Sequence, residues 1–265
     1  MHLTDRVALV TGASRGIGLA IASQLRDAGC HLVLTARSVE ALQAISRPGD
    51  LVVPGDLLDA SFREHLISQA LATHGRIDLL VNNAGVGHYR TSIEADSAEI
   101  RTLWELNFFA PLELARLVVP GMLEQPLLPD AQERGMVVNI SSVAGMVTLP
   151  WFSMYSASKF ALCSWTEGLR MEYGSRGIRT LAVCPGYVKT EFQESVLSGT
   201  PPPALAKSKE RFAITPEACA REVLRGIRRN KRIVVTPRSN WALVAAARWM
   251  PVLLEKRLAR ISGTG

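Results

Sequence analysis

Cysteine is scarce in this chain of 265 residues, which contains only four. Cys30, Cys163, Cys184 and Cys219 lie far apart and show neither the paired spacing of a zinc site nor the density of a disulfide framework. We therefore expect reduced, mostly buried thiols, no metal site and a reducing, cytoplasmic location.

Both ends of the chain lack a long apolar run. Near the C-terminus, the run at 241–254 is broken by Arg248 and Pro251 and is shorter than the roughly 20 residues that span a bilayer. At the N-terminus an alternating apolar run starts almost at once, without a basic segment or a small-residue cleavage site. The sequence therefore predicts neither a transmembrane helix nor secretion.

Acidic residues are nearly absent from the last part of the chain. After residue 224 there is one acid, Glu255, although the whole chain has a net charge of only +6. The basic residues of this part are Arg225, Arg228, Arg229, Lys231, Arg232, Arg238, Arg248, Lys256, Arg257 and Arg260. With 48% hydrophobic and 20% charged residues, the composition as a whole is typical of a globular protein with a substantial core.

Apolar runs typical of buried strands alternate along the chain with segments of helical period. The runs predict strands at 6–11, 31–36, 51–54, 78–83, 135–141, 179–185 and 232–237, and helices at about 16–28, 39–46, 60–74, 97–123, 153–174 and 216–229. Strands that are apolar throughout are buried on both faces. The sequence therefore predicts one α/β domain at 1–237 with a doubly wound parallel sheet, a Rossmann fold with helices on both faces. Residues 238–265 are predicted to form a basic, helical, amphipathic C-terminal extension.

Ligands of such sheets bind beyond the carboxyl ends of the strands, so the residues that follow each strand are the candidates for chemistry. The segment TGASRGIG at 11–18 joins the first strand to a helix. Its glycines allow a tight turn and a close approach of backbone amides to a pyrophosphate, although a plain glycine-rich turn is the alternative. The candidate dinucleotide-binding residues here are Gly12, Ser14, Arg15, Gly16, Ile17 and Gly18.

The end of the second strand reads TARS, with Arg37 where a ribose-binding carboxylate is expected in proteins that use NAD. Arg37 and Arg15 can both present guanidinium groups to a 2′-phosphate, which favours NADP(H) as the cofactor. The alternative is that both arginines are solvated surface residues.

Two further strand ends supply candidate cofactor contacts. After the third strand, Asp56 and Leu57 can face the adenine, but Asp56 can equally cap the next helix. After the fourth strand, Asn83, Ala84 and Gly85 lie in the segment NNAG, where Asn83 can bind neighbouring backbone or simply form a turn.

Tyr155 and Lys159 are four residues apart in a predicted helix and therefore share one face. A cation close to a phenol lowers the phenol's pKa from about 10 toward neutral pH, so Tyr155 is a candidate proton donor or acceptor. Ser142 follows the fifth strand, from where its hydroxyl can donate to a carbonyl oxygen. An exposed helical pair is the alternative for Tyr155 and Lys159.

Residues 6–190 resemble the short-chain dehydrogenase/reductase family, in its oxidoreductase branch that prefers NADP. The resemblance rests on the motifs TGASRGIG, NNAG, NISSVAG, YSASK and CPGYVKT, which occur in the family's order and spacing. It implies that Tyr155 is the catalytic acid and base, that Lys159 lowers its pKa and binds the nicotinamide ribose, and that Ser142 orients the substrate carbonyl.

The resemblance also implies two groups of residues that spacing alone does not single out. Asn107, in the segment ELNFFA, matches the asparagine that anchors a water of the proton relay. The segment after the sixth strand matches the part that packs on the nicotinamide, with Pro185, Gly186, Val188 and Thr190 as contacts.

The expected substrate is apolar. The segment between Ser142 and Tyr155 and the substrate loop at 187–215 supply the candidate pocket wall, although core packing also explains several of its members. These apolar residues are Met146, Val147, Leu149, Trp151, Phe152, Met154, Tyr187, Phe192, Val196, Leu197 and Phe212.

The C-terminal extension differs from the glycine-rich tail of family members that reduce acyl thioesters. Leu254, Leu258 and Ile261 form one apolar stripe beside basic residues, so the extension can lie on an anionic membrane or dock on its own domain or on a partner subunit. The partners we expect are a hydrophobic small molecule and further copies of the chain in a dimer or tetramer, with no nucleic acid.

The predicted function is therefore an NADP(H)-dependent oxidoreductase that interconverts a ketone and a secondary alcohol on a hydrophobic substrate. Two alternatives remain open: a cofactor-binding regulatory or scaffold protein without turnover, and a reductase of thioester-linked 3-oxoacyl groups.

Overall fold

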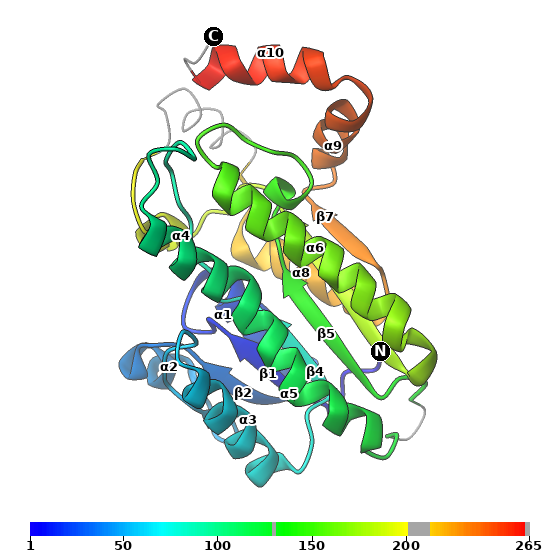
Figure 1. The fold of residues 1–265 in the computed structure, drawn as a ribbon. Coiled ribbons are helices and arrows are strands. Elements are labelled where there is room, and N and C mark those ends of the chain that lie inside the picture. Colours follow the sequence, from blue (N-terminus) through cyan, green and yellow to red (C-terminus); the bar gives the residue numbers. More distant parts are fainter. Residues whose placement is uncertain (129–130, 201–212, 263–265) are drawn as a thin grey trace.

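A seven-stranded parallel sheet forms the centre of the molecule in the computed structural model, which describes residues 1–128, 131–200 and 213–262 (Figure 1). The strand order is β3-β2-β1-β4-β5-β6-β7, and each pair of neighbours is parallel. The strands are β1 (Val7–Thr11), β2 (His31–Thr35), β3 (Leu51–Val52), β4 (Leu79–Asn82), β5 (Gly135–Ile140), β6 (Ile178–Pro185) and β7 (Ile233–Thr236). Six lie within the predicted strand segments and β6 starts one residue before its segment, so the predicted doubly wound fold is confirmed.

Helices cover both faces of the sheet because each presents an apolar stripe to it. On one face α1 and α8 pack through residues such as Ile21 and Val223, and on the other face α3, α5 and α6 pack through Leu66, Leu114 and Leu169. These helices and the short α2 are α1 (Gly16–Asp27), α2 (Val39–Ile45), α3 (Ala60–His74), α5 (Ala110–Glu124), α6 (Ser153–Tyr173) and α8 (Pro216–Arg228).

The helix predicted at 97–123 is a composite of three segments. Helix α4 (Ser97–Trp104) continues into a π-helical turn at Glu105–Phe109 and then into α5. The run Ser97–Glu124 is long enough to cross a membrane, and an 18-residue window within it has a mean hydropathy of 1.3. Its residues Leu114 and Val118 pack against the sheet, however, as in the core helix of a soluble protein.

The C-terminal extension consists of two helices, α9 (Asn240–Trp249) and α10 (Pro251–Ser262), separated at Met250. Figure 1 shows α9 directly after β7 and α10 farther from the sheet, at the end of the molecule. The predicted helical character of the extension is confirmed, although proline at 251 divides it in two. Part of the predicted substrate loop, including Phe212, lies outside the described residues.

Candidate active site

One cavity of about 1020 Å³ lies at the carboxyl ends of the central strands and collects almost every predicted site residue. Strands β1 and β4 are neighbours here although β2 and β3 intervene in the sequence, so this is the topological switch point where such sheets bind ligands. Of the predicted residues, Gly18 and Asn107 do not line the cavity, and both lie behind its wall. The predicted residues that do line it are Gly12, Ser14, Arg15, Gly16, Ile17, Arg37, Asp56, Leu57, Asn83, Ala84, Gly85, Ser142, Tyr155, Lys159, Pro185, Gly186, Val188 and Thr190.

The glycine-rich turn after β1 is braced by Asn83. Gly12 has a φ of 61°, which glycine adopts without strain. The side-chain amide of Asn83 donates to the carbonyl oxygens of Thr11 and Gly12 at 2.9 and 3.1 Å. A Cβ atom at Gly18 would lie 2.2 Å from the Gly12 oxygen, so α1 can start this close to the turn only with glycine there. Asn83 therefore connects β4 to the turn, as one of its two predicted roles requires.

The two arginines expected at a 2′-phosphate differ in what they contact. The guanidinium of Arg15 donates to Glu194 at 2.6 Å and to the hydroxyl of Ser195 at 2.7 Å, so it connects the glycine-rich turn to the short helix at Glu191–Ser195. Arg37 is exposed at the cavity and forms no ion pair with any other described residue. Arg37 is therefore the more available cation for a bound phosphate.

Asp56 does not cap the helix that follows it. Its carboxylate accepts from the amide of Leu58 at 3.0 Å inside the turn, whereas Asp59 accepts from Ser61 and caps α3. The alternative that Asp56 is the N-cap is therefore wrong. Its position in the cavity wall leaves the predicted adenine contact open.

The Tyr155 ring is held by aromatic packing at the inner end of the cavity. It stacks on Phe152 with 4.2 Å between ring centres, and it meets Phe192 edge-on at 6.1 Å. Burial raises the pKa of Tyr155 well above its ordinary value of 10, and a hydrogen bond with Ser142 opposes this rise. The phenol is therefore neutral at physiological pH and can donate its proton.

Lys159 shares the face of α6 with Tyr155, as predicted. Its ammonium group donates to the carbonyl oxygen of Ile140 at 3.0 Å and lies 5.8 Å from the centre of the Tyr155 ring. Burial lowers the pKa of Lys159 from 10.5 to about 8. The expectation that Lys159 lowers the pKa of Tyr155 is wrong in this structure, because the removal of the phenol from water outweighs every favourable contact and the cation is bound to Ile140.

Asn107 lies in the π-helical turn and is fully buried. It accepts from the amide of Val86 at 2.9 Å, and its own amide donates to the Val86 carbonyl at 3.0 Å and to Ser158 at 3.3 Å. A Cβ atom at Gly85 would lie 2.9 Å from the Asn107 oxygen and 3.4 Å from the Lys159 ammonium group. Asn107 therefore fixes the backbone after β4 beside Lys159, and the extra residue of the π turn gives it this position.

The apolar part of the cavity agrees with the sequence only in part. Five predicted wall residues do line it: Leu149, Phe152, Tyr187, Phe192 and Leu197. The other described members of the predicted wall do not line the cavity, although Val196 packs against the apolar cluster that includes Tyr155. They are Met146, Val147, Trp151, Met154 and Val196.

Several residues that line the cavity were not predicted as part of the site, among them four from outside the predicted motifs. Tyr89 follows the NNAG motif and stacks on Phe152 with 4.6 Å between ring centres. Asn240 and Leu243 come from α9, and Leu258 comes from α10. The apolar stripe of the extension was the signal for Leu258, whereas no motif marks the other three.

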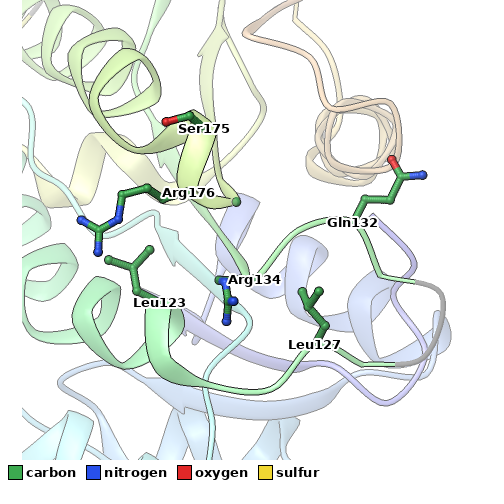
Figure 2. A pocket seen from close by; sticks show the side chains of 7 residues that line it. Leu123, Leu127, Gln132, Arg134, Ser175 and Arg176 are labelled. Atoms are coloured by element: carbon green, nitrogen blue, oxygen red, sulfur yellow. The ribbon is translucent and has the colours of Figure 1, made fainter.

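A second, smaller concavity lies at the opposite edge of the sheet. Figure 2 shows its side chains, which include Leu123, Leu127, Arg134 and Arg176. Arg134 directly precedes β5 and Gly177 directly precedes β6, so this concavity is at the amino ends of the strands. It contains none of the predicted catalytic residues and is not the candidate active site.

The main cavity fits a nicotinamide dinucleotide. The glycine-rich turn opens onto the amino end of α1, and Arg37 and Asp56 lie where an adenosine would be held. At the other end, Pro185, Gly186, Tyr155 and Lys159 surround the space for the reactive ring. Donors and apolar surfaces are therefore present along the full length of such a ligand.

Comparison with known proteins agrees with this geometry. Residues 6–200 match the family model for short chain dehydrogenases. The chain is 34% identical over 239 residues to a protein of Nostoc sp. described as ketoacyl reductase HetN, covering 88% of this chain and 79% of that protein. A short chain dehydrogenase structure from Burkholderia cenocepacia in complex with NADP superposes with a TM-score of 0.79 at 26% identity, covering 97% of this chain and 99% of that one.

A second structure, a short chain dehydrogenase/reductase from Burkholderia phymatum in complex with NAD, superposes with a TM-score of 0.82 and covers 96% of both chains. At 23% identity this similarity concerns the fold alone. The family model spans most of the chain and includes the glycine-rich turn, Ser142, Tyr155 and Lys159. The chain belongs to the short-chain dehydrogenase/reductase family of oxidoreductases.

Proposed function

We propose that this protein interconverts a ketone and a secondary alcohol with NADP(H), on a hydrophobic substrate. The observation that carries the proposal is the continuity of one cavity, which reaches from Arg37 past Tyr155 to apolar residues of the C-terminal helices. A cofactor-binding scaffold has no physical need for a buried phenol and a buried lysine at the end of such a cavity. The membership of the oxidoreductase family supports turnover as well.

In the proposed reduction, a bound nicotinamide would supply the hydride for the carbonyl carbon. Tyr155 is the proton donor to the carbonyl oxygen, and its burial supports this role because the phenol stays protonated at neutral pH. Ser142, whose hydroxyl is hydrogen-bonded to Tyr155, would donate to the same oxygen. Lys159, which donates to the Ile140 carbonyl, would hold the nicotinamide ribose, and glycine at position 85 leaves room beside its ammonium group.

The choice of NADP(H) over NAD(H) rests on the end of β2. Ala36, Arg37 and Ser38 line the cavity there and none of them is a carboxylate that would repel a phosphate. Arg37 offers two parallel N–H donors, the geometry that a phosphate accepts best. The relative from Burkholderia cenocepacia that binds NADP is consistent with this choice.

A 3-oxoacyl thioester is the second candidate substrate, because the relative from Nostoc is described as a ketoacyl reductase. The apolar wall with Leu149, Phe192 and Leu197 accepts either an acyl chain or a lipid-like or aromatic ketone. The leading proposal is a free hydrophobic ketone, because Leu243 and Leu258 extend the apolar lining of the cavity.

The test is a screen of steroid, lipid and aromatic ketones and a 3-oxoacyl thioester, with oxidation of NADPH or NADH as the readout. We expect turnover of a hydrophobic ketone with NADPH and its loss in Ser142→Ala. Ser61→Ala, on the exposed start of α3, is the matched control and should keep full activity. Tight NADPH binding without turnover of any compound would favour the scaffold instead, and turnover of the thioester alone would favour the second candidate.

A further inference from the structure

Four exposed apolar residues cluster where α9 meets α10. The exposed fractions are 84% for Trp249, 52% for Met250, 61% for Val252 and 64% for Leu253. The other exposed large apolar residues of the described chain are not gathered in such a run within five positions. Contiguous apolar surface of this kind marks a contact with a partner or a membrane.

Positive charge surrounds this cluster on the same face of α10. Val252, Lys256 and Arg260 are spaced four residues apart, so they form one row along the helix, and all three are exposed. Arg248 and Arg257 add two further exposed cations, and none of these cations forms an ion pair within the described residues. We call this surface, formed by Arg248, Trp249, Met250, Val252, Leu253, Lys256, Arg257 and Arg260, the tail face.

The opposite side of α10 faces the cavity. Leu254 and Leu258 are partly buried, and Leu258 lines the cavity together with Leu243 of α9. The two sides of α10 therefore differ: Leu254 and Leu258 turn inward, and the tail face turns to solvent. Figure 1 shows α10 at the outer end of the molecule, where a flat surface can reach it. The tail face is thus next to the apolar end of the cavity.

Charge decides between a bilayer and a second copy of the chain as the occupant. Between residues 238 and 262 there are five cations and one acid, Glu255. Two identical tail faces packed on each other would bring these cations together without acids to pair with them. A bilayer with anionic lipids instead attracts the cations, and its interface accommodates an exposed tryptophan.

We propose that the tail face binds the surface of an anionic membrane, with α10 lying in the interface plane. Trp249 and Leu253 insert among the lipid head groups, while Lys256 and Arg260 pair with lipid phosphates. Leu258 then lies between the membrane and the cavity, so that a hydrophobic compound can pass from one to the other. The binding itself does not depend on the proposed reaction, and only the passage of substrate rests on it.

The test is co-sedimentation of the full chain with vesicles of phosphatidylcholine, with or without phosphatidylglycerol. We expect binding to the anionic vesicles only, and release at high salt. Trp249→Glu with Leu253→Glu should abolish binding, and each of Lys256→Gln and Arg260→Gln should weaken it about fivefold. The matched control is Ile93→Glu with Met171→Glu, two side chains that are 94% and 75% exposed elsewhere, and it should bind like the wild type.

Thermal unfolding and NADPH binding of every variant must match the wild type, which separates loss of the tail face from misfolding. Equal binding of neutral and anionic vesicles, or equal loss in the control pair, would overturn the proposal. A third outcome would also overturn it: the double variant Trp249→Glu and Leu253→Glu still binds vesicles, but sedimentation velocity shows that it no longer forms a dimer seen for the wild type. The tail face would then belong to a subunit interface. A failure of the ketone screen leaves this vesicle result unchanged, so the two proposals fail separately.

Discussion

The ammonium group of Lys159 lies 5.8 Å from the centre of the Tyr155 ring and donates to the carbonyl oxygen of Ile140. Both side chains are buried beside the cavity, and burial shifts their pKa values in opposite directions, toward the neutral form of each. The structure thus holds a neutral acid next to a cation that loses its proton readily.

Tyr155→Phe removes the proton donor but keeps the ring that stacks on Phe152. We expect the rate of ketone reduction to fall by roughly 10²- to 10⁴-fold, the usual contribution of a general acid, while NADPH binds as before. Stopped-flow reduction and a fluorescence titration with NADPH measure the two quantities. Tyr173→Phe, at the far end of the same helix, is the control and should change neither. Undiminished reduction by the Tyr155 variant would remove this residue from the chemistry.

Lys159→Met removes a buried cation. Because burial lowers the pKa of Lys159 from 10.5 to about 8, the folded protein binds this proton less tightly than the unfolded chain does. The resulting cost to the free energy of unfolding is largest below pH 8 and disappears as the pH rises from 8 to 10.5. We expect the inactive variant to be more stable than the wild type near neutral pH, by up to about 3 kcal/mol.

Urea unfolding near pH 7 and near pH 10, without added cofactor, measures this difference. The difference should shrink at the higher pH, where the folded forms of both proteins carry an uncharged side chain at position 159. The thiols of Cys30 and Cys219, whose pKa values burial raises to about 12, titrate in both proteins and cancel from the comparison. A gap that stays constant with pH would point to packing rather than charge.

Arg37→Ala removes the exposed cation at the end of β2. We expect NADPH to bind roughly 10- to 100-fold more weakly, since hydrogen bonds to charged groups contribute about 1.5–3 kcal/mol, and NADH to bind nearly as before. Isothermal titration with both cofactors measures the two constants. Arg47→Ala, an exposed arginine after α2, is the control and should affect neither cofactor. An equal loss for NADPH and NADH would contradict the assignment of Arg37 to the 2′-phosphate.

Arg15 is expected at the same phosphate but is paired with Glu194 at 2.6 Å. The pair is largely exposed, so it contributes about 1 kcal/mol or less, and a bound phosphate can displace it. Glu194→Gln should therefore raise NADPH affinity by up to about fivefold and leave NADH unchanged. Glu191→Gln, whose carboxylate is 4.0 Å from Arg15, should have a smaller effect of the same sign. If Glu194→Gln weakens NADPH binding, the carboxylate positions Arg15 rather than competing for it.

The sequence was enough to predict the sheet because its strands are apolar on both faces, a pattern that few other arrangements produce. The order of the motifs along the chain predicted that Ser142, Tyr155 and Lys159 belong to one site, and all three line the same cavity. What sequence spacing could not predict was the π turn that turns Asn107 inward, since its pattern fits an ordinary helix.

The state of Tyr155 was also beyond the sequence. A four-residue spacing puts Lys159 on the same side of the helix, but the competing partner, the carbonyl of Ile140, comes from another element. The extent of burial, which decides the direction of the pKa shift, depends on Phe152 and Phe192 closing around the ring. The position of Leu258 in the cavity wall also could not be predicted from the sequence, because it depends on how α9 directs α10 back over the cavity.

Gly18→Ala tests whether the close approach of α1 to the glycine-rich turn is required for cofactor binding. An added Cβ would lie 2.2 Å from the Gly12 oxygen and 2.4 Å from the Asn83 amide nitrogen. We expect a loss of about 1–3 kcal/mol in the free energy of unfolding and a large loss of NADPH affinity. Gly121→Ala is a close control, because Gly121 is also helical and has no atom of another residue near its added Cβ. In a helix, alanine is more favourable than glycine by up to about 1 kcal/mol, so Gly121→Ala should raise the free energy of unfolding. If Gly18→Ala lowers it instead, the loss is due to the steric clash at Gly18.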